Sequence, residues 1–245
     1  MDDISRFEAE KAERIKGYKT DAEMRELCRQ FLEKTVEVKY SYNFNWLGLP
    51  IIQYPQDIVA MQEIIWEYRP ELIVETGIAR GGSIIFYASM LDLLGGDGRV
   101  IGVDLDIRQH NREKIEAHAF SRRVEMIQGS SVDVSVIGKV FDSAKGSGRV
   151  LVVLDSNHTR DHVLAELHAY SPLVKKGGYM VVFDTFVENL PDRLCLDRPW
   201  GKGDNPMTAV NEFMKQNDRF VLVDDIEDKL MLTVAPGGYL RCVKD

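Results

Sequence analysis

The sequence has few cysteines and little positive charge, and both shortages exclude functions. Among its 245 residues are only three cysteines, Cys28, Cys195 and Cys242, with no Cys-x-x-Cys pair, so we expect neither a disulfide framework nor a zinc site. Lys and Arg number 31 against 39 Asp and Glu, which gives a formal net charge of −8. This sign does not suit a surface that neutralises phosphate backbones. We therefore expect no nucleic-acid partner, and a reducing compartment.

Long apolar segments are also missing. No uninterrupted apolar stretch approaches the roughly 20 residues that span a bilayer. Residues 1–5 lack the cationic start and the apolar core of a signal peptide. The apolar runs that do occur, such as residues 150–154, have the length of a strand. These observations predict a soluble, cytoplasmic protein without a transmembrane segment.

The first 45 residues differ from the rest and predict a helical arm. Charged residues dominate up to Lys39, and apolar residues recur at helical spacing, namely Met24, Leu27, Cys28, Phe31 and Leu32. Thr20-Asp21-Ala22-Glu23 has the pattern of a capping box that starts this helix. A single helix leaves such a stripe exposed, so we expect the arm to pack on the main domain or on another subunit. The arm therefore favours a homo-oligomer.

Residues 46–245 are expected to form one α/β domain. Short Val- and Ile-rich runs alternate with helical segments, as in a parallel sheet with helices on both faces. Strands are expected at 72–76, 99–103, 124–128, 149–154 and 179–183, and helices at 55–68, 82–94, 109–119, 134–143, 158–171 and 206–216. Two last strands, 220–223 and 230–235, lie too close for a helical crossover and should pair antiparallel. The predicted fold is a Rossmann-like, doubly wound seven-stranded sheet with an antiparallel last strand.

The segment that joins the arm to this domain is aromatic, polar and without periodicity. It spans residues 40–48 and contains Tyr40, Tyr42, Phe44 and Trp46. Such a segment is either a connecting loop that packs on the core or part of a wall that faces the substrate. The sequence leaves both interpretations open.

The loop after the first strand of the sheet is rich in glycine. It reads Glu75-Thr76-Gly77-Ile78-Ala79-Arg80-Gly81-Gly82-Ser83, and in a doubly wound sheet it would border the ligand crevice. It contains neither the G-x-G-x-x-G of dinucleotide-binding proteins nor the G-K-[ST] of a phosphate loop. Its E-x-G-x-x-x-G pattern resembles the nucleotide loop of class I S-adenosylmethionine methyltransferases. The implied cofactor is S-adenosylmethionine and not NAD(P).

The resemblance also implies which residues hold the cofactor. In these methyltransferases an acid that ends the second strand holds the ribose hydroxyls, and a polar segment after the third strand lies near the adenine. Asp104 and residues 128–131 stand in these places here, although Asp104 taken alone could also cap a helix. The implied cofactor-binding residues are Glu75, Gly77, Arg80, Gly81, Ser83, Asp104, Gly129, Ser130 and Asp155.

Two aspartates and a histidine follow the fourth and fifth strands. Asp155 ends the fourth strand, His158 comes three residues later, and Asp184 ends the fifth strand. Two carboxylates that converge from adjacent strands suit a hard cation such as Mg²⁺. The cation would lower the pKa of a substrate hydroxyl, and a histidine that titrates near neutrality could take the proton. Two other interpretations stay open: Asp155 caps the next helix, or His158 is a structural histidine.

Longer motifs make the resemblance more specific. Four segments together resemble the cephalosporin hydroxylase/rhamnosyl O-methyltransferase family. They are Asn43-x-x-Trp46-Leu47-Gly48-x-Pro50, Gln53-Tyr54-Pro55-Gln56-Asp57, the glycine loop and Asp155-x-x-His158. The similarity runs from about residue 40 to the C-terminus. In the magnesium-dependent macrolide-sugar relatives, the aspartate of D-x-x-H binds the metal and the histidine is the base, which implies these roles for Asp155 and His158. Those relatives end the fifth strand with an acidic pair, whereas this chain has Phe183-Asp184, so one metal ligand is missing and Glu188 is a candidate replacement.

The resemblance predicts O-methylation of a sugar hydroxyl in a glycolipid, a polysaccharide or a glycosylated metabolite. One alternative is a non-haem iron hydroxylase in which Asp155, His158 and His162 form a two-histidine, one-carboxylate triad. That alternative gives the glycine loop and Asp104 no role. The other alternative is an inactive nucleotide-binding subunit, which the replacement by Phe183 favours.

Overall fold

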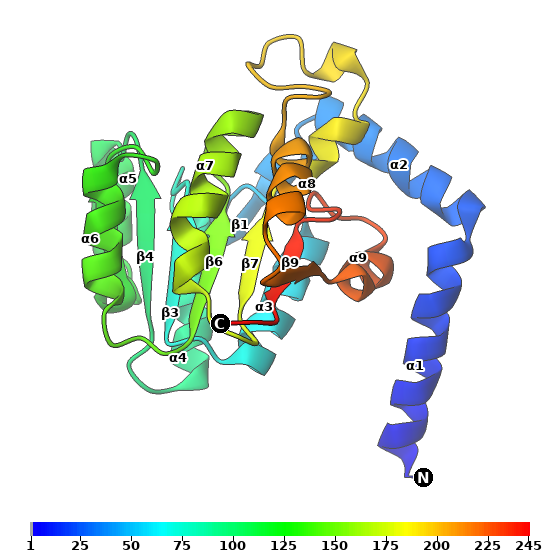
Figure 1. Ribbon diagram of the computed structural model, residues 1–245, viewed down its shortest axis with the longest axis horizontal. Coiled ribbons are helices and arrows are strands. Elements are labelled where there is room, and N and C mark those ends of the chain that lie inside the picture. Colours follow the sequence, from blue (N-terminus) through cyan, green and yellow to red (C-terminus); the bar gives the residue numbers. More distant parts are fainter. Residues whose placement is uncertain (1) are drawn as a thin grey trace.

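The computed structural model describes residues 2–245, and a single twisted sheet forms its centre (Figure 1). The sheet has seven strands in the order β5-β4-β3-β6-β7-β9-β8. Its strands are β3 (Leu72–Thr76), β4 (Arg99–Asp104), β5 (Val124–Gln128), β6 (Val150–Leu154), β7 (Tyr179–Val182), β8 (Phe220–Leu222) and β9 (Tyr239–Cys242). The neighbours from β5 to β7 pair in parallel, and β9 pairs antiparallel with both β7 and β8. The predicted architecture is confirmed.

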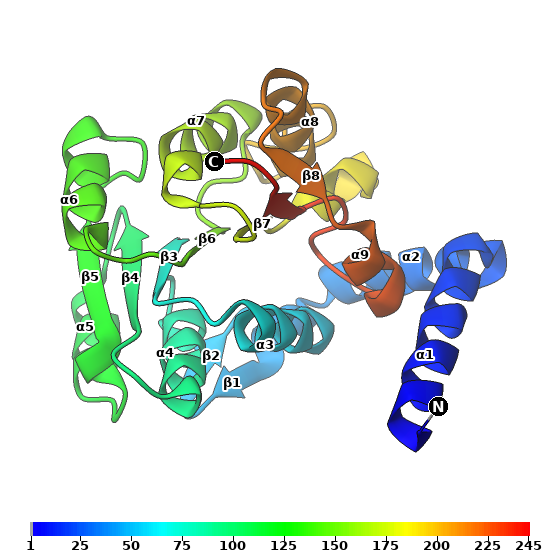
Figure 2. The same ribbon diagram turned by 60° about the horizontal axis from the view of Figure 1, so that its bottom comes forward.

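Helices cover both faces of the sheet (Figure 2). One face carries α3 (Pro55–Tyr68), α4 (Gly82–Leu94) and α5 (Gln109–Glu116), and the other carries α6 (Val134–Ala144), α7 (Arg160–Tyr170) and α8 (Pro206–Gln216). Successive side chains of a strand point to opposite faces. In β3, Ile73 therefore belongs to one apolar cluster, and Leu72 and Val74 belong to the other. Short 3₁₀ turns complete the domain: Ser121–Arg123, Ser171–Leu173, Thr185–Asn189 and Asp192–Leu194.

The strand order reverses at β3, which lies between β4 and β6. Ligands of open α/β sheets bind at such a point, outside the carboxyl ends of the strands. Here Gly77 has φ +96, and a Cβ on it would lie 2.1 Å from the backbone oxygen of Asp155. Only glycine therefore lets the loop after β3 approach the end of β6 this closely.

The last strand does not lie where the sequence predicts it. Residues 230–235 are not a strand: the helix α9 (Asp224–Leu230) ends there, and β9 begins only at Tyr239. The backbone N–H of Val234 donates to the buried carboxylate of Asp57 (3.1 Å), and so do the hydroxyls of Thr233 and Tyr239. Burial raises the pKa of Asp57 to about 6. This apolar segment is therefore bound by a side chain on α3 and not by a neighbouring strand.

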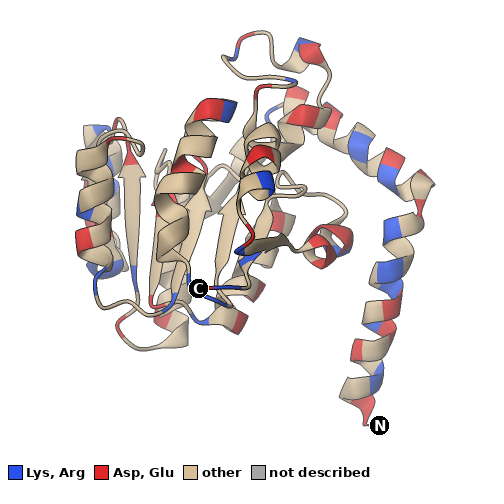
Figure 3. Cartoon of the chain, viewed as in Figure 1, with Lys and Arg blue, Asp and Glu red and all other residues tan. Residues whose placement is uncertain are grey.

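The N-terminal arm consists of two helices, α1 (Asp3–Thr20) and α2 (Ala22–Glu37). Figure 1 shows α1 pointing away from the domain, and Figure 3 shows both charges distributed along the two helices. The predicted capping box at Thr20 is wrong: Thr20 belongs to α1, and Asp21 caps α2 by accepting from the N–H of Met24 (2.9 Å). No helix within residues 2–245 has the length and apolar character needed to cross a membrane.

The apolar stripe of α2 is only partly covered. Met24, Leu27 and Phe31 are 39%, 54% and 42% exposed, so the expected packing of these residues on the main domain is not found. Further along the helix, Leu32 and Val36 pack against the core. The stripe therefore meets the domain only at the end of α2, and its apolar side chains from Met24 to Phe31 stay partly exposed.

Residues 40–51 combine the two interpretations that the sequence left open. A 3₁₀ turn (Tyr40–Asn43) leads into a hairpin of β1 (Phe44–Trp46) and β2 (Leu49–Ile51). Trp46 packs edge-on against Phe86 of α4, with 4.8 Å between the ring centroids. Ser41 and Tyr42, in contrast, line the large cavity described below. The aromatic residues thus bind the segment to the core, and the turn before them forms part of the cavity wall.

Candidate active site

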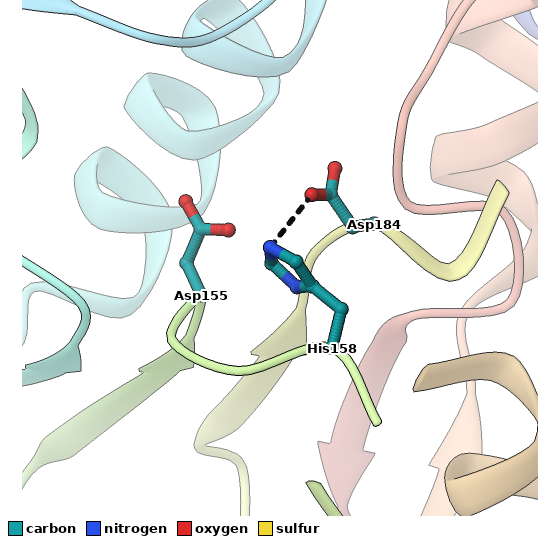
Figure 4. Close-up of side chains that lie close together, drawn as sticks. All are labelled: Asp155, His158 and Asp184. Atoms are coloured by element: carbon teal, nitrogen blue, oxygen red, sulfur yellow. Dashed lines mark ion pairs between the residues drawn. The ribbon is translucent and has the colours of Figure 1, made fainter. Parts of the chain in front are cut away.

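Asp155, His158 and Asp184 meet at the carboxyl ends of β6 and β7, as the sequence predicts (Figure 4). Their ligand atoms all lie within 4.8 Å of one another, and the Nε2 of His158 is 3.1 Å from the Oδ2 of Asp184. His158 lies in the loop before α7 and is not the first residue of that helix, which begins at Arg160. Asp184 has φ +57, a left-handed conformation that is uncommon for non-glycine residues and in which Asp is enriched.

The carboxyl group of Asp155 lacks strong partners. Its Oδ2 accepts one long hydrogen bond, 3.4 Å, from the side chain of Gln53. Burial raises the pKa of Asp155 well above its ordinary value, and the nearby charges of Asp184 and Glu75 raise it further. Asp155 does not cap α7, because the N-cap of that helix is Thr159. A carboxyl group in this setting requires a proton or a nearby cation.

An aromatic residue that the sequence analysis missed packs against His158. The ring of Trp200 lies edge-on to the imidazole, with 4.7 Å between the centroids, and Arg198 lies over the indole ring. Trp200 comes from the long segment between β7 and α8, more than 40 residues after His158. No spacing in the sequence links the two residues, so only the folded structure identifies this contact.

A cavity of about 790 Å³ opens above this centre. Asp155, His158 and Asp184 form part of its lining together with the glycine-loop residues Gly77, Arg80 and Ser83. Its opposite walls come from the end of α2 with the following turn and from the segment after β7, and include Val36, Tyr42, Phe186, Leu190, Leu194 and Trp200. Arg193 joins these two walls through an ion pair of 2.7 Å with Glu37. A volume of this size accommodates a small-molecule ligand.

Glu75 and Gly81 are buried members of the glycine loop and do not line the cavity. Glu75 is 1% exposed, and its Oε2 accepts from the hydroxyl of Ser83 (2.8 Å). Its Oε1 has no hydrogen-bond partner among residues 2–245. Burial raises the pKa of Glu75 to about 8, and the negative charge of Asp104 adds to this effect. Gly81 has φ +87, and a Cβ on it would lie 2.5 Å from the side chain of Ile115.

Asp104, Gly129 and Ser130 lie beside the cavity. The Oδ2 of Asp104 accepts from the N–H groups of Ile78 (2.8 Å) and Ala79 (3.0 Å), so Asp104 fastens the glycine loop. It does not cap α5, whose N-cap is Arg108. The N–H of Gly129 donates to the backbone oxygen of Asp104 (2.8 Å), which brings the loop after β5 next to this acid. None of the three predicted residues lines the cavity itself. Asp104 is joined to it through Ile78 and Ala79, which do line it, and Gly129 and Ser130 follow β5 on the far side of Asp104.

No third carboxylate completes the centre within the described residues. Phe183 is 1% exposed and belongs to the apolar core. Glu188 does not replace the missing acid, because its Oε2 accepts from the N–H of Gly203 (2.8 Å) and from the Asn205 carboxamide. The predicted hydroxylase triad is not assembled either. The Nε2 of His162 lies 3.0 Å from the Ser131 hydroxyl and takes no part in the cluster of Asp155 and His158.

Comparison with known proteins agrees with this geometry. A family model described as Rhamnosyl O-methyltransferase/CmcI matches residues 38–243. The rhamnosyl O-methyltransferase of Mycobacterium bovis (strain BCG / Pasteur 1173P2) is 27% identical over 226 residues, which covers 90% of this chain and 85% of the relative. The protein of the same name from Mycobacterium leprae is 27% identical over 197 residues, with 80% and 81% coverage.

Solved structures show the same fold. A CmcI structure with Mg and SAM aligns with a TM-score of 0.57 at 19% identity, covering 82% of this chain and 77% of that chain. The O-methyltransferase TomG from Streptomyces achromogenes, in complex with SAM, aligns with a TM-score of 0.56 at 15% identity and covers 92% of both chains. Because the family model matches residues 38–243, well over half of the sequence, this chain belongs to the rhamnosyl O-methyltransferase/CmcI family of methyltransferases.

Proposed function

We propose that this methyltransferase transfers a methyl group from S-adenosylmethionine to a hydroxyl group of a sugar in a glycolipid, a polysaccharide or a glycosylated metabolite. The observation that carries the proposal is the convergence of Asp155, His158 and Asp184 beside the glycine loop, in one cavity. The rhamnosyl O-methyltransferases among the relatives act, by name, on a sugar. A cavity of about 790 Å³ gives room for an acceptor next to the cofactor.

The residues present fit S-adenosylmethionine. Gly77 lets the glycine loop lie directly against the end of β6 at Asp155, and the acidic residues around it suit a cofactor with a sulfonium and an ammonium group. We assign the ribose hydroxyls to Asp104 and the adenine to Gly129 and Ser130. The methionine end is assigned to the cavity side of the loop, at Arg80, Ser83 and Asp155. Glu75 and Gly81 would then act by shaping the loop.

The residues also fit a divalent cation, with Asp155 and Asp184 as the two protein ligands. Mg²⁺ is commonly held by one or two carboxylates with water completing the shell. The weakly partnered carboxyl of Asp155, beside the second carboxylate of Asp184, supports a cation there. A bound cation would lower the pKa of the acceptor hydroxyl. Because Phe183 lies in the core and Glu188 is bound elsewhere, we expect Mg²⁺ to bind more weakly than in relatives with an acidic pair.

His158 is assigned as the general base. Its Nε2 points into the centre between the two carboxyl groups (Figure 4). As the acceptor oxygen forms its bond to the methyl carbon, the carbon–sulfur bond breaks and the hydroxyl proton passes to this nitrogen. The Oδ2 of Asp184 faces this nitrogen at 3.1 Å. When Asp184 binds a cation, that carboxylate is engaged and leaves the Nε2 lone pair to the acceptor hydroxyl, and Trp200 restricts the rotation of the ring. A positioned base of this kind contributes on the order of 10²–10⁴-fold to the rate.

The arm is proposed to mediate self-association in a cytoplasmic homo-oligomer. We retain the division into an arm, residues 1–45, and a methyltransferase domain, residues 46–245. The exposed apolar side chains Met24, Leu27 and Phe31 support this role for the arm. Every copy of the chain carries this stripe, and in a symmetric dimer the same surface of each copy contacts the other. We therefore propose a second copy of the chain as the partner of the arm.

The decisive experiment follows transfer of a labelled methyl group from S-adenosylmethionine to simple rhamnosides and other glycosides. We expect label in the glycoside, loss of transfer in EDTA and its return with Mg²⁺. Transfer that persists in EDTA contradicts the metal assignment and leaves Asp155 and Asp184 as orienting residues. Oxygen consumption without methyl transfer supports the hydroxylase alternative. Tight cofactor binding without transfer to any acceptor supports the inactive-subunit alternative.

A further inference from the structure

A buried carboxylate on α7 contacts the loop that carries the catalytic centre. Glu166 is 0% exposed, and its Oε1 accepts from the hydroxyl of Ser156 (2.7 Å). Ser156 directly follows Asp155 in the sequence. Glu166 therefore holds the catalytic loop from behind, although it does not line the cavity.

The same face of α7 contacts the loop after β5. His162 lies one turn before Glu166, with its Nε2 3.4 Å from the Glu166 Oε1 and 3.0 Å from the Ser131 hydroxyl. Tyr170, one turn after Glu166, donates its hydroxyl to the backbone oxygen of Ser131 (2.7 Å). Residues four apart share one face of a helix. One row of polar side chains on α7 thus joins the loop of Ser131 to the loop of Ser156.

The sheet itself does not hold these two loops together. They follow β5 and β6, which are separated by β4 and β3 in the strand order. The connection through His162 and Glu166 therefore links two loops that follow non-neighbouring strands. It joins the loop assigned to the adenine with the centre assigned to methyl transfer.

This polar connection is less favourable in free energy than apolar packing at the same place would be. Burying a carboxylate and an imidazole in place of apolar side chains costs free energy unless every polar atom is paired. The Oε2 of Glu166 has no hydrogen-bond partner within residues 2–245. If Glu166 only filled space, an apolar side chain such as leucine would be more favourable there. The buried polar side chains therefore indicate that the positions of the two loops must be fixed.

We propose that Glu166 and His162 are positioning residues that fix the distance between the adenine loop (Gly129–Ser131) and the catalytic loop (Asp155–His158). This inference rests on the proposed function, because it assigns the two loops to opposite ends of one cofactor. S-adenosylmethionine must contact both loops at once for its methyl group to face the acceptor. Loosening the connection therefore weakens cofactor binding and slows transfer, and leaves acceptor binding unchanged.

The test compares wild type with His162→Ala, Glu166→Leu, Glu166→Gln and, as a matched control, His168→Ala. His168 is an exposed histidine on the same helix. Calorimetry gives the affinity for S-adenosylhomocysteine, methyl transfer gives kcat and the acceptor KM, and circular dichroism shows that each variant is folded at the assay temperature. His162→Ala is the milder variant, because its side chain is 20% exposed.

We expect His162→Ala and Glu166→Leu to lose on the order of tenfold in cofactor affinity, the effect of one lost charged hydrogen bond, and to lower kcat at constant acceptor KM. Glu166→Gln, whose amide oxygen still accepts from Ser156, should recover most of both. Folded variants that bind and react like wild type overturn the positioning role alone. Wild-type protein that binds no S-adenosylhomocysteine overturns the proposed function, and the role of Glu166 with it.

Discussion

Replacing Glu75 by glutamine should stabilise the protein at alkaline pH. The side chain is buried, and its pKa is raised from 4.5 to about 8, so the folded state keeps a proton that the unfolded state releases. Ionisation of Glu75 therefore leaves the free energy of unfolding unchanged below pH 4.5, lowers it progressively between pH 4.5 and 8, and lowers it no further above pH 8. The shift corresponds to on the order of 4–5 kcal/mol. Glutamine keeps the shape and the acceptor for Ser83 but has no proton to lose.

Urea denaturation at pH 5 and pH 8 measures this effect. The free energy of unfolding of Glu75→Gln should exceed that of wild type by several kcal/mol at pH 8 and by much less at pH 5. Glu71→Gln is a control of opposite sign, because Glu71 accepts from the N–H of Gly148 (2.7 Å) and its pKa is lowered. That contribution is present above pH 4.5 and is lost only as the pH falls below it, so Glu71→Gln should be less stable than wild type by a similar amount at pH 5 and pH 8. A Glu75→Gln variant that is no more stable than wild type at pH 8 would show that Glu75 is ionised and compensated in the folded protein, contrary to its raised pKa.

Three further predictions address the site and the arm. Asp104→Ala should weaken binding of S-adenosylhomocysteine by on the order of 1–3 kcal/mol in calorimetry, and equal affinity would remove Asp104 from the site. His158→Ala should lower kcat by about 10²–10⁴-fold with little change in cofactor affinity, and full turnover across pH would contradict its role as base. Deleting residues 1–38 should change the molecular mass seen by light scattering or cause aggregation, and an unchanged, well-behaved species would show that the arm is dispensable for assembly.

The strands and helices that position the centre could be predicted because their signals are local. Val- and Ile-rich runs such as 150–154 identify buried parallel strands, and the carboxyl ends of such strands meet at one edge. This rule alone predicts that Asp155 and Asp184 lie close together. It could not assign β9, because the apolar run before it is bound by the buried carboxylate of Asp57, which comes from a helix far away in the sequence.

The contacts that complete the centre were beyond the reach of the sequence for the same reason. Trp200 and Gln53 reach His158 and Asp155 from distant segments, and no periodicity marks them. The sequence also could not show that Glu188 is unavailable as a metal ligand, because its carboxylate accepts from a backbone N–H 15 residues later in the chain. Contacts between segments that are distant in the sequence leave no local pattern, so only the folded structure identifies them.

Calorimetric titration of the wild-type chain, residues 1–245, tests the identity of the cofactor without knowledge of the acceptor. The glycine loop at Gly77, together with Asp104, predicts saturable one-to-one binding of S-adenosylmethionine and S-adenosylhomocysteine, and no binding of NAD⁺ under the same conditions. A protein that binds NAD⁺ and not S-adenosylhomocysteine, or that binds neither, would contradict the assignment of S-adenosylmethionine as the cofactor.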